Sequence, residues 1–181
     1  YRMDRAAFAA APSDARIHRN DLTHLLAFTP SERWHRRREF LGAAMERLEA
    51  GQAVYTACTE GRLAHFGWLA LRQTQARLTE VDYVMPLPPG SATMYDFYTH
   101  PEDRGQGLYR ASLRRMLGDA FADQATESAW IFVLADNVAS RRAIEATGFR
   151  HVGTSRLTRR FGRQSTVYEP EEVTGPSQGR T

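Results

Sequence analysis

Apolar residues recur along the chain at two spacings, and each spacing predicts one kind of secondary structure. One group recurs at the spacing of a helix face and consists of Trp34, Leu41, Met45 and Leu48. We expect this helix to begin at residues 29–32, with Thr29 as the N-cap and Glu32 completing a capping box, and to end at Gly51. A shorter helix is predicted over residues 20–28.

The middle of the chain shows the patterns of strands. Residues 53–60 and 63–73 flank a Glu-Gly turn and predict a hairpin. Residues 76–85 alternate in polarity and predict a third strand, whereas residues 86–91 (PLPPGS) are expected to form a turn-rich break. Residues 92–100 are predicted to be the next strand.

The last third of the chain is predicted to alternate helices with strands. A helix is expected over residues 108–121, with an apolar face formed by Leu108, Leu113, Met116, Leu117, Ala120 and Phe121. Residues 129–135 form a continuous apolar run, which is typical of a strand buried on both faces. A further helix is expected from Asn137 to Gly148. The remaining strands are predicted near residues 1–8, 149–157 and 159–170. This order predicts an α/β (α+β) domain on a mixed sheet.

Size and composition indicate one globular domain. The chain has 181 residues, of which 42% are hydrophobic, and this is enough to bury a core without covalent staples. We expect the domain to span residues 1–169 and residues 170–181 to form a disordered tail. Cys58 is the only cysteine, so no internal disulfide can form. No run approaches the roughly 18 apolar residues of a membrane span, and a cytoplasmic protein without a membrane partner is expected, as a monomer or homodimer.

The charge of the chain indicates little about its partners. The net charge is +3, and all 24 cationic side chains are arginines. Guanidinium groups suit phosphates, but a GC-rich genome explains the same preference for arginine without any anionic partner. A charge of +3 is too small to indicate nucleic acid by itself. A nucleic-acid-binding module therefore ranks last among the functions considered, and we expect no nucleic-acid partner.

A first motif lies where a strand gives way to a helix. It reads Arg-Gly-Gln-Gly over Arg104–Gly107, and the helix is expected to open at about Gly107. The first N–H groups of a helix have no intrahelical partner and attract anions. Gly105 lets the backbone approach a ligand closely, and Arg110 and Arg114 add positive charge. Alone, the motif fits a turn before a helix as well as it fits a pyrophosphate cradle.

A second motif follows the apolar strand, at residues 136–149 (DNVASRRAIEATGF). Asn137 can cap the helix that follows, and Ser140 lies one turn further on, facing the same end. Gly148 has the position of a C-cap glycine, and Phe149 enters the next strand. A well-capped surface helix explains the asparagine and the glycine, but it does not explain why this unit follows the Arg-Gly-Gln-Gly helix and an apolar strand.

Together the two motifs resemble those of the GCN5-related N-acetyltransferase (GNAT) superfamily. The acyl-CoA motif of that family, [Arg/Gln]-x-x-Gly-x-[Gly/Ala], matches Arg104 and Gly107, and its Asn-x-x-[Ala/Ser] motif matches Asn137 and Ser140. The resemblance is firm over about residues 92–156. The chain departs from it at two positions. Tyr109 stands where the first motif ends in a small residue, and Ile144 occupies the slot of a tyrosine that serves many members as general acid.

The resemblance implies a GNAT-like fold with a mixed, mostly antiparallel central sheet that is flanked by helices. Two central strands, residues 92–100 and 129–135, would splay apart and admit acetyl-CoA as co-substrate. A backbone N–H near Phe97 or Tyr98 would act as the oxyanion donor. The residues implied in cofactor binding are Phe97, Tyr98, Thr99, Arg104, Gly105, Gln106, Gly107, Leu108, Tyr109, Arg110, Asn137 and Ser140.

The resemblance also implies an N-acetyltransferase in which a substrate amine attacks the thioester directly. The amine must first lose a proton, and Asp96 on the binding strand is the candidate general base. Glu80 and Asp82, which are expected on the neighbouring strand, are the other carboxylates considered for this role. Strict alternation would place Asp96 and Tyr98 on one face of the strand and, on the other face, Tyr95, Phe97 and Thr99.

The acceptor is expected to be a primary amine of a small polar molecule, with an amino sugar as one candidate. Trp68 could floor its pocket, in a region made aromatic by Tyr83, Tyr95 and Tyr98. The alternative function is a non-catalytic CoA-binding or regulatory domain, which the missing general acid makes conceivable. No metal is expected, because no metal-ligand spacing is found among His24, His35, His65, His100 and His151.

Overall fold

The computed structural model describes residues 1–10, 12–31, 36–160 and 163–171. A long hairpin of β4 (Arg62–Leu78) and β5 (Tyr83–Thr99) forms the centre of the fold. The predicted hairpin between β3 (Ala53–Thr59) and β4 is confirmed. Glu60 and Gly61 turn it with φ values of 51° and 75°, the positive values that a tight hairpin turn requires.

The described strands form a six-stranded sheet in the order β1-β6-β5-β4-β3-β2 and a separate pair, β7-β8. Every pairing is antiparallel except that of β5 with β6. The sheet is therefore mixed and mostly antiparallel, as predicted. The bounds of the strands not yet given are β1 Arg2–Asp4, β2 His18–Arg19, β6 Ser128–Ile131, β7 Gly153–Arg160 and β8 Arg163–Pro170.

The two parallel strands part in the middle of the sheet. Their pairing runs from Ser91↔Ser128 to Met94↔Ile131. Beyond this point β6 ends, while β5 continues against β4 as far as Thr99. The predicted splay is thus present. The apolar run at 129–135 is a strand only as far as Ile131, because the chain then leaves the sheet, and Leu134 is 53% exposed.

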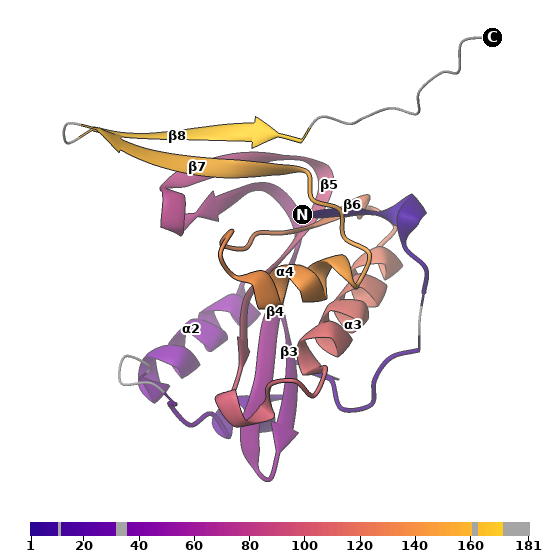
Figure 1. Cartoon of the computed structure of the whole chain (residues 1–181). Coiled ribbons are helices and arrows are strands. Elements are labelled where there is room, and N and C mark those ends of the chain that lie inside the picture. The colour runs from indigo at the N-terminus through magenta and orange to yellow at the C-terminus, as the bar shows by residue number, and fades with distance from the viewer. Residues whose placement is uncertain (11, 32–35, 161–162, 172–181) are drawn as a thin grey trace.

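Helices cover both faces of the central hairpin, and each face has its own core (Figure 1). On one face, Leu25 of α1, Phe28 shortly after it and Ala44 of α2 belong to a cluster around Trp68. On the other face, α3 and α4 pack against Met94 and its neighbours. The bounds of the helices are α1 Leu22–Leu26, α2 Arg37–Glu49, α3 Leu108–Ala122 and α4 Val138–Glu145. None of the described helices is long and apolar enough to span a membrane.

The start of α2 was predicted wrongly. The helix begins at Arg37, and residues 29–31 are not helical; Glu32 and Trp34 lie outside the described residues. Ser31 instead forms a hydrogen bond with the hydroxyl of Tyr98 on β5. A contact made by the folded sheet therefore outweighs the local capping signal at Thr29.

The segment from 76 to 91 was also assigned wrongly. Residues 76–85 are not one strand, because the chain turns through a short 3-10 helix at Thr79–Val81 and a left-handed Asp82. Residues 86–91 are not a break, because β5 runs through them. Pairing with β4 passes from Gln75↔Pro86 to Gln73↔Ser91, so the prolines between lie in a bulge, where a missing N–H costs no ladder bond.

The C-terminal half follows the sequence pattern closely. Helix α3 matches the predicted range 108–121, and all six residues of its predicted apolar face are buried. Helix α4 begins after Asn137 as expected, and the two final strands form the β7-β8 hairpin. The tail from residue 172 onward lies outside the described residues.

Candidate active site

The N-terminus of α3 is open to an anion. Gly107 occupies the N-cap position with φ 78°, so it lies in the left-handed region, and no side chain caps the helix. Its first turn carries no acidic residue. Because the first amides of a helix lack intrahelical partners, those that follow Gly107 are left to bind a ligand or water. Gly105 is also left-handed, with φ 80°.

Guanidinium groups surround the loop before α3. Arg104 donates from Nε to the carbonyl oxygen of Thr99 at 3.4 Å, and Arg16 donates to the carbonyl oxygen of Gln106 at 3.3 Å. The start of the loop is anchored by Asp103, a buried carboxylate that pairs with Arg62 at 3.0 Å. The loop thus combines a fixed backbone with positive charge.

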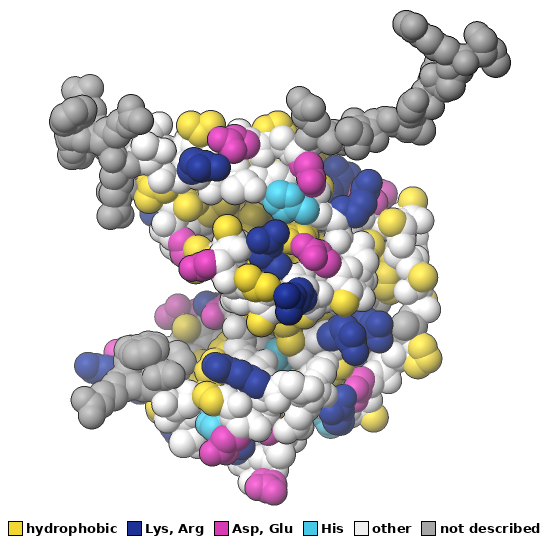
Figure 2. Space-filling view, viewed as in Figure 1, with side chains coloured by type: hydrophobic (Ala, Val, Ile, Leu, Met, Phe, Trp, Pro, Cys, Tyr) yellow, Lys and Arg dark blue, Asp and Glu magenta, His cyan; other side chains and the backbone are white. Residues whose placement is uncertain are grey.

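The first turn of α4 meets that of α3. The side-chain oxygen of Asn137 accepts a hydrogen bond from the amide of Ser140 at 3.1 Å and caps α4. Tyr109 of α3 reaches Ser140 through a side-chain hydrogen bond, while burial raises the pKa of its phenol. The irregular residue of the first motif therefore bridges the two helices. Figure 2 shows the surface hollowed between the part that carries α4 and the part that carries α2.

A β-bulge interrupts β5 beside this opening. Phe66 pairs with Tyr98, and Trp68 pairs with Tyr95, so two residues of β5 oppose Gly67 alone. The first of these two, Asp96, has φ 51°. A bulge of this kind leaves backbone groups of β5 out of the ladder.

The bulge reverses the alternation of side chains along β5. Tyr95 and Tyr98 both pack into the core beneath α2, whereas Phe97 packs against the core beneath α3. The expectation that Tyr95 shares a face with Phe97 was therefore wrong. The expectation that Asp96 and Tyr98 share a face is confirmed, because Tyr98 packs into the core beneath α2 and Asp96 forms an ion pair with Arg47 of the same helix.

A cavity of about 210 Å³ lies between α2 and the sheet. Its walls are aromatic: Phe28 stacks on Phe40 at 4.0 Å between ring centres, and Trp68 also lines the cavity. Two carboxylates, those of Glu39 and Asp96, border it. Two arginines also line it: Arg47 pairs with Asp96, and Arg36 pairs with Glu39 at 3.8 Å.

Arg47 connects the cavity beneath α2 with the bulge. Its guanidinium carbon lies 5.1 Å from the ring centre of Trp68 and 5.2 Å from that of Tyr95, while the group binds the carboxylate of Asp96. Glu39 and Arg47 were not identified from the sequence. Their signal, two charges eight residues apart on one helix, does not differ from that of an ordinary solvated helix face.

Three other residues expected in this region lie elsewhere. Glu80, Asp82 and Tyr83 surround the far turn of the β4-β5 hairpin, where Asp82 pairs with Arg77 at 3.9 Å. The alternatives to Asp96 as base are therefore at the wrong end of the hairpin. Only two of the three tyrosines, Tyr95 and Tyr98, contribute to the aromatic core beneath α2.

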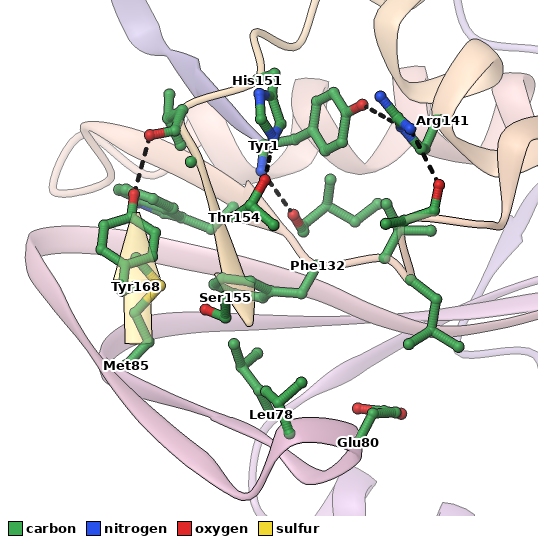
Figure 3. Close-up of a pocket in the computed structure, with 18 residues that line it drawn as sticks. Tyr1, Leu78, Glu80, Met85, Phe132, Arg141, His151, Thr154, Ser155 and Tyr168 are labelled. Carbon is green, nitrogen blue, oxygen red and sulfur yellow. Dashed lines mark hydrogen bonds between the residues drawn. The ribbon is translucent and has the colours of Figure 1, made fainter. Parts of the chain in front are cut away.

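A further cavity of about 250 Å³ lies between β6 and the β7-β8 hairpin (Figure 3). Its one arginine, Arg141, donates to the hydroxyl of Tyr1 and to the carbonyl oxygen of Ala135, both at 3.0 Å. Tyr168 donates to the carbonyl oxygen of Val152 at 3.0 Å. These polar groups are satisfied within the protein, and the cavity is not lined by the residues of α3 or the bulge, so we do not assign the acceptor to it.

His65 is a buried residue of the site that the sequence analysis did not identify. It lies on β4, fully buried, with its Nδ1 2.8 Å from the hydroxyl oxygen of Thr99. Its ring lies 6.3 Å from that of Phe97 and 6.1 Å from that of Tyr109. Burial lowers the pKa of His65 to about 3. The face that carries α3 therefore has a buried, neutral imidazole beneath Phe97 and Tyr109.

Parallel strands that part beside an uncapped helix N-terminus match the arrangement that the resemblance to the GNAT superfamily implied. A protein-family model described as "Acetyltransferase (GNAT) domain" matches residues 4–150 of this chain. The chain therefore belongs to the GNAT acetyltransferase family.

Solved structures of the same fold support this assignment. The chain is similar to AAC(6')-Iy in complex with the bisubstrate analogue CoA-S-monomethyl-acetylneamine, with 17% identity, a TM-score of 0.57 and coverage of 80% of this chain and 96% of that one. It is also similar to yncA from Salmonella typhimurium with acetyl-CoA, with 17% identity, a TM-score of 0.55 and coverage of 90% and 98%. No curated protein sequence matches the chain.

Proposed function

We propose that the protein transfers an acetyl group from acetyl-CoA to a primary amine of a small polar molecule, and that amino sugars are the leading acceptor class. The observation that carries this proposal is the cavity beneath α2, in which the carboxylates of Glu39 and Asp96 border aromatic walls. These carboxylates are paired with Arg36 and Arg47, so the border offers both acceptors and donors to a polar amine, and the aromatic rings suit the apolar face of a sugar. The names of two similar structures, AAC(6')-Iy and the aminoglycoside 6'-N-acetyltransferase AAC(6')-IG of Acinetobacter haemolyticus, agree with this class.

For the cofactor, we propose that the amides of residues 106–110 hold the pyrophosphate, with Arg104 contributing charge. The pantetheine would follow the main chain of residues 97–99, in the gap that opens beyond Met94 and Ile131. Asn137 and Ser140 would border it from the first turn of α4. No side chain caps the N-terminus of α3, and this supports the arrangement, because the first amides of the helix are then available to bind the pyrophosphate.

A bound ammonium group must lose two protons, one to a base before it attacks and one to water as the amide forms, and negative charge must be stabilised on the thioester oxygen. Asp96 is the proposed base, because its carboxylate borders the cavity and lies on the bulge. The amine nitrogen forms the new bond to the carbonyl carbon, and the carbon–sulfur bond breaks as the thiolate leaves. A backbone N–H of the bulged segment near Phe97 or Tyr98 would stabilise the oxyanion.

The leaving thiolate has no side-chain proton donor at the usual position, because that position holds Ile144, which carries no acidic proton and is fully buried in the core. Tyr109 is a poor substitute, since burial raises the pKa of its phenol above the ordinary value near 10, whereas thiols have pKa values near 8.5. Proton transfer from Tyr109 to the thiolate would therefore be unfavourable. We propose that the thiolate leaves unprotonated and takes its proton from water.

The alternative is a domain that binds acetyl-CoA without turning it over, which the buried Ile144 favours. Both functions predict binding of acetyl-CoA, and they differ in thiol release. We expect CoA thiol to appear when acetyl-CoA is incubated with one or more members of an amine panel that includes amino sugars, alkyl diamines and amino acids. Binding of acetyl-CoA by calorimetry without thiol release from any of them would support the alternative.

A further inference from the structure

Three side chains converge at the outer edge of the sheet, away from the acceptor cavity. His18 belongs to β2, Asp21 is the N-cap of α1, and His24 lies in α1. The Oδ2 atom of Asp21 lies 3.8 Å from Nδ1 of His18 and 3.6 Å from Nε2 of His24. One ligand atom from each residue can be chosen so that all three lie within 4.8 Å of one another.

The two oxygens of Asp21 have separate roles. Oδ1 accepts hydrogen bonds from the amides of Thr23 and His24, at 2.9 and 3.2 Å, and thereby caps α1. Oδ2 is left to face the two imidazoles. The cap therefore fixes the carboxylate in an orientation that directs one oxygen at both histidines.

A hydrogen bond from the opposite side orients His24. The hydroxyl of Thr56 points its hydrogen at the carbonyl oxygen of His18, at 3.4 Å, so its oxygen is free to accept from Nδ1 of His24 at 3.0 Å. With Nδ1 of His24 held by Thr56, Nε2 lies 3.6 Å from the carboxylate oxygen of Asp21, where one ion can contact both atoms.

We propose that His18, Asp21 and His24 bind a divalent transition metal, with Zn²⁺ as the best match. Two imidazole nitrogens and one carboxylate oxygen are ligands that Zn²⁺ prefers, and water can complete a tetrahedron. Ligand atoms about 2.0–2.1 Å from the metal lie roughly 3.4 Å apart in such a site. The separations of 3.6 and 3.8 Å need only small side-chain adjustments. Thr56 would orient the ligand His24, as hydrogen-bond partners of metal ligands commonly do.

The ion would act on stability and not on the transfer reaction, because acetyl transfer in this family needs no metal. It would tie the five-residue helix α1 to β2 at the sheet edge. Helix α1 leads directly to Phe28, which lines the acceptor cavity. The expectation that no metal binds was based on the spacing of five histidines that did not include His18; the pattern His-x-x-Asp-x-x-His is the signal in the sequence.

The test uses the full chain without a polyhistidine tag, treated with EDTA and dialysed. Calorimetry with ZnCl₂ at neutral pH is expected to show one bound ion per chain, and Co²⁺ is expected to give the visible absorption bands of a four-coordinate site. His24→Ala and His18→Ala should each weaken Zn²⁺ binding at least tenfold. Asp21→Asn should do the same while keeping an oxygen that can cap α1. His151→Ala, a histidine outside the cluster, should bind as the parent does.

Thermal unfolding with and without ZnCl₂ separates binding from misfolding. Zinc should raise the midpoint of the parent and of His151→Ala, but not that of Asp21→Asn, because a ligand of the folded state stabilises it by mass action. Thr56→Val should weaken binding to a smaller extent. The proposal is overturned if the parent binds no Zn²⁺ at micromolar concentrations, or if the three ligand variants bind it as tightly as the parent.

Discussion

The two faces of the β4-β5 hairpin are built in different ways. The face beneath α3 and α4 offers main-chain groups: an uncapped helix N-terminus after Gly107, and a strand whose pairing with β6 stops at Met94. The face beneath α2 offers side chains, with Glu39, Arg47 and Asp96 around an aromatic cavity. Main-chain groups suit a co-substrate that never changes, whereas side chains can be replaced without altering the fold. Under the proposed function, the face beneath α3 and α4 is the cofactor face, the general part of the molecule, and the face beneath α2 is the acceptor face, its specific part.

The largest expected effect is on the acceptor face, at Asp96. If its carboxylate removes the proton from the amine, Asp96→Asn should lower kcat/KM for the acceptor by about a hundredfold or more while the Kd for acetyl-CoA changes little. Asparagine tolerates the left-handed backbone that position 96 requires. Steady-state kinetics with an accepted amine, and calorimetry with acetyl-CoA, measure the two quantities.

Two variants control this experiment. Asp82→Asn changes another left-handed aspartate of the same hairpin, at its far turn, and should leave kcat/KM unchanged. Arg47→Gln breaks the ion pair but keeps the carboxylate, so it should cost less than Asp96→Asn. Equal losses in Arg47→Gln and Asp96→Asn would show that the pair matters only for structure, and full kcat/KM in Asp96→Asn would refute the assignment of the base.

The difference between the faces also explains what the sequence could predict. Gly107, Asn137 and the apolar face of α3 are local signals, each read within one turn of a helix, and the structure has them where they were expected. The bulge lies at a contact between two residues that are 30 positions apart in the sequence. Phe97 packs on Gly67, where an added Cβ atom would come within 2.3 Å of the phenyl ring. Strict alternation could not foresee that, so it assigned Tyr95 to the wrong face.

The next largest effect is expected at Gly67, the residue opposite the bulge, which joins the two faces. Gly67→Ala would place a methyl group against the ring of Phe97 and near Met116. We expect it to lower the free energy of unfolding by about 2 kcal/mol, the cost of overpacking a core, and to impair both acetyl-CoA binding and turnover. Denaturant unfolding and calorimetry measure these changes.

Gly42→Ala is the matched control for Gly67→Ala. Gly42 lies in α2 with nothing within 4 Å of an added Cβ, and alanine in a helix interior should stabilise the protein slightly. If Gly67→Ala were as stable and as active as Gly42→Ala, the bulge would not depend on the contact between Phe97 and Gly67.

The third largest effect, a weakening of acetyl-CoA binding by about tenfold, is expected at Gly107 on the cofactor face. Its φ of 78° is strained for alanine by about 1–2 kcal/mol, so Gly107→Ala should shift the first turn of α3 and weaken acetyl-CoA binding by about this factor. Gly118→Ala is an exact counterpart within the same helix, because both glycines have open space around them and only Gly107 has a positive φ. Calorimetry should show a Kd within twofold of the parent for Gly118→Ala. If Gly107→Ala and the more disruptive Gly107→Pro both bind as tightly as the parent, the pyrophosphate does not lie at this helix.

The smallest expected effect is a pH dependence of stability from His65, beneath the cofactor face. Burial lowers its pKa in the folded protein to about 3, whereas an unfolded histidine has a pKa near 6.5. Between these values the unfolded chain holds one more proton than the folded chain, so this contribution to stability is complete above pH 6.5 and is lost progressively as the pH falls. Between pH 6.5 and 5.5 the loss should be about 1 kcal/mol.

His65→Gln, which can still bind the hydroxyl of Thr99, should flatten the pH profile of stability by this amount in urea unfolding. His151→Gln, which replaces a partly exposed histidine, should not. A parent and a His65→Gln variant with equal slopes over this range would mean that burial beneath Phe97 and Tyr109 does not lower the pKa of His65.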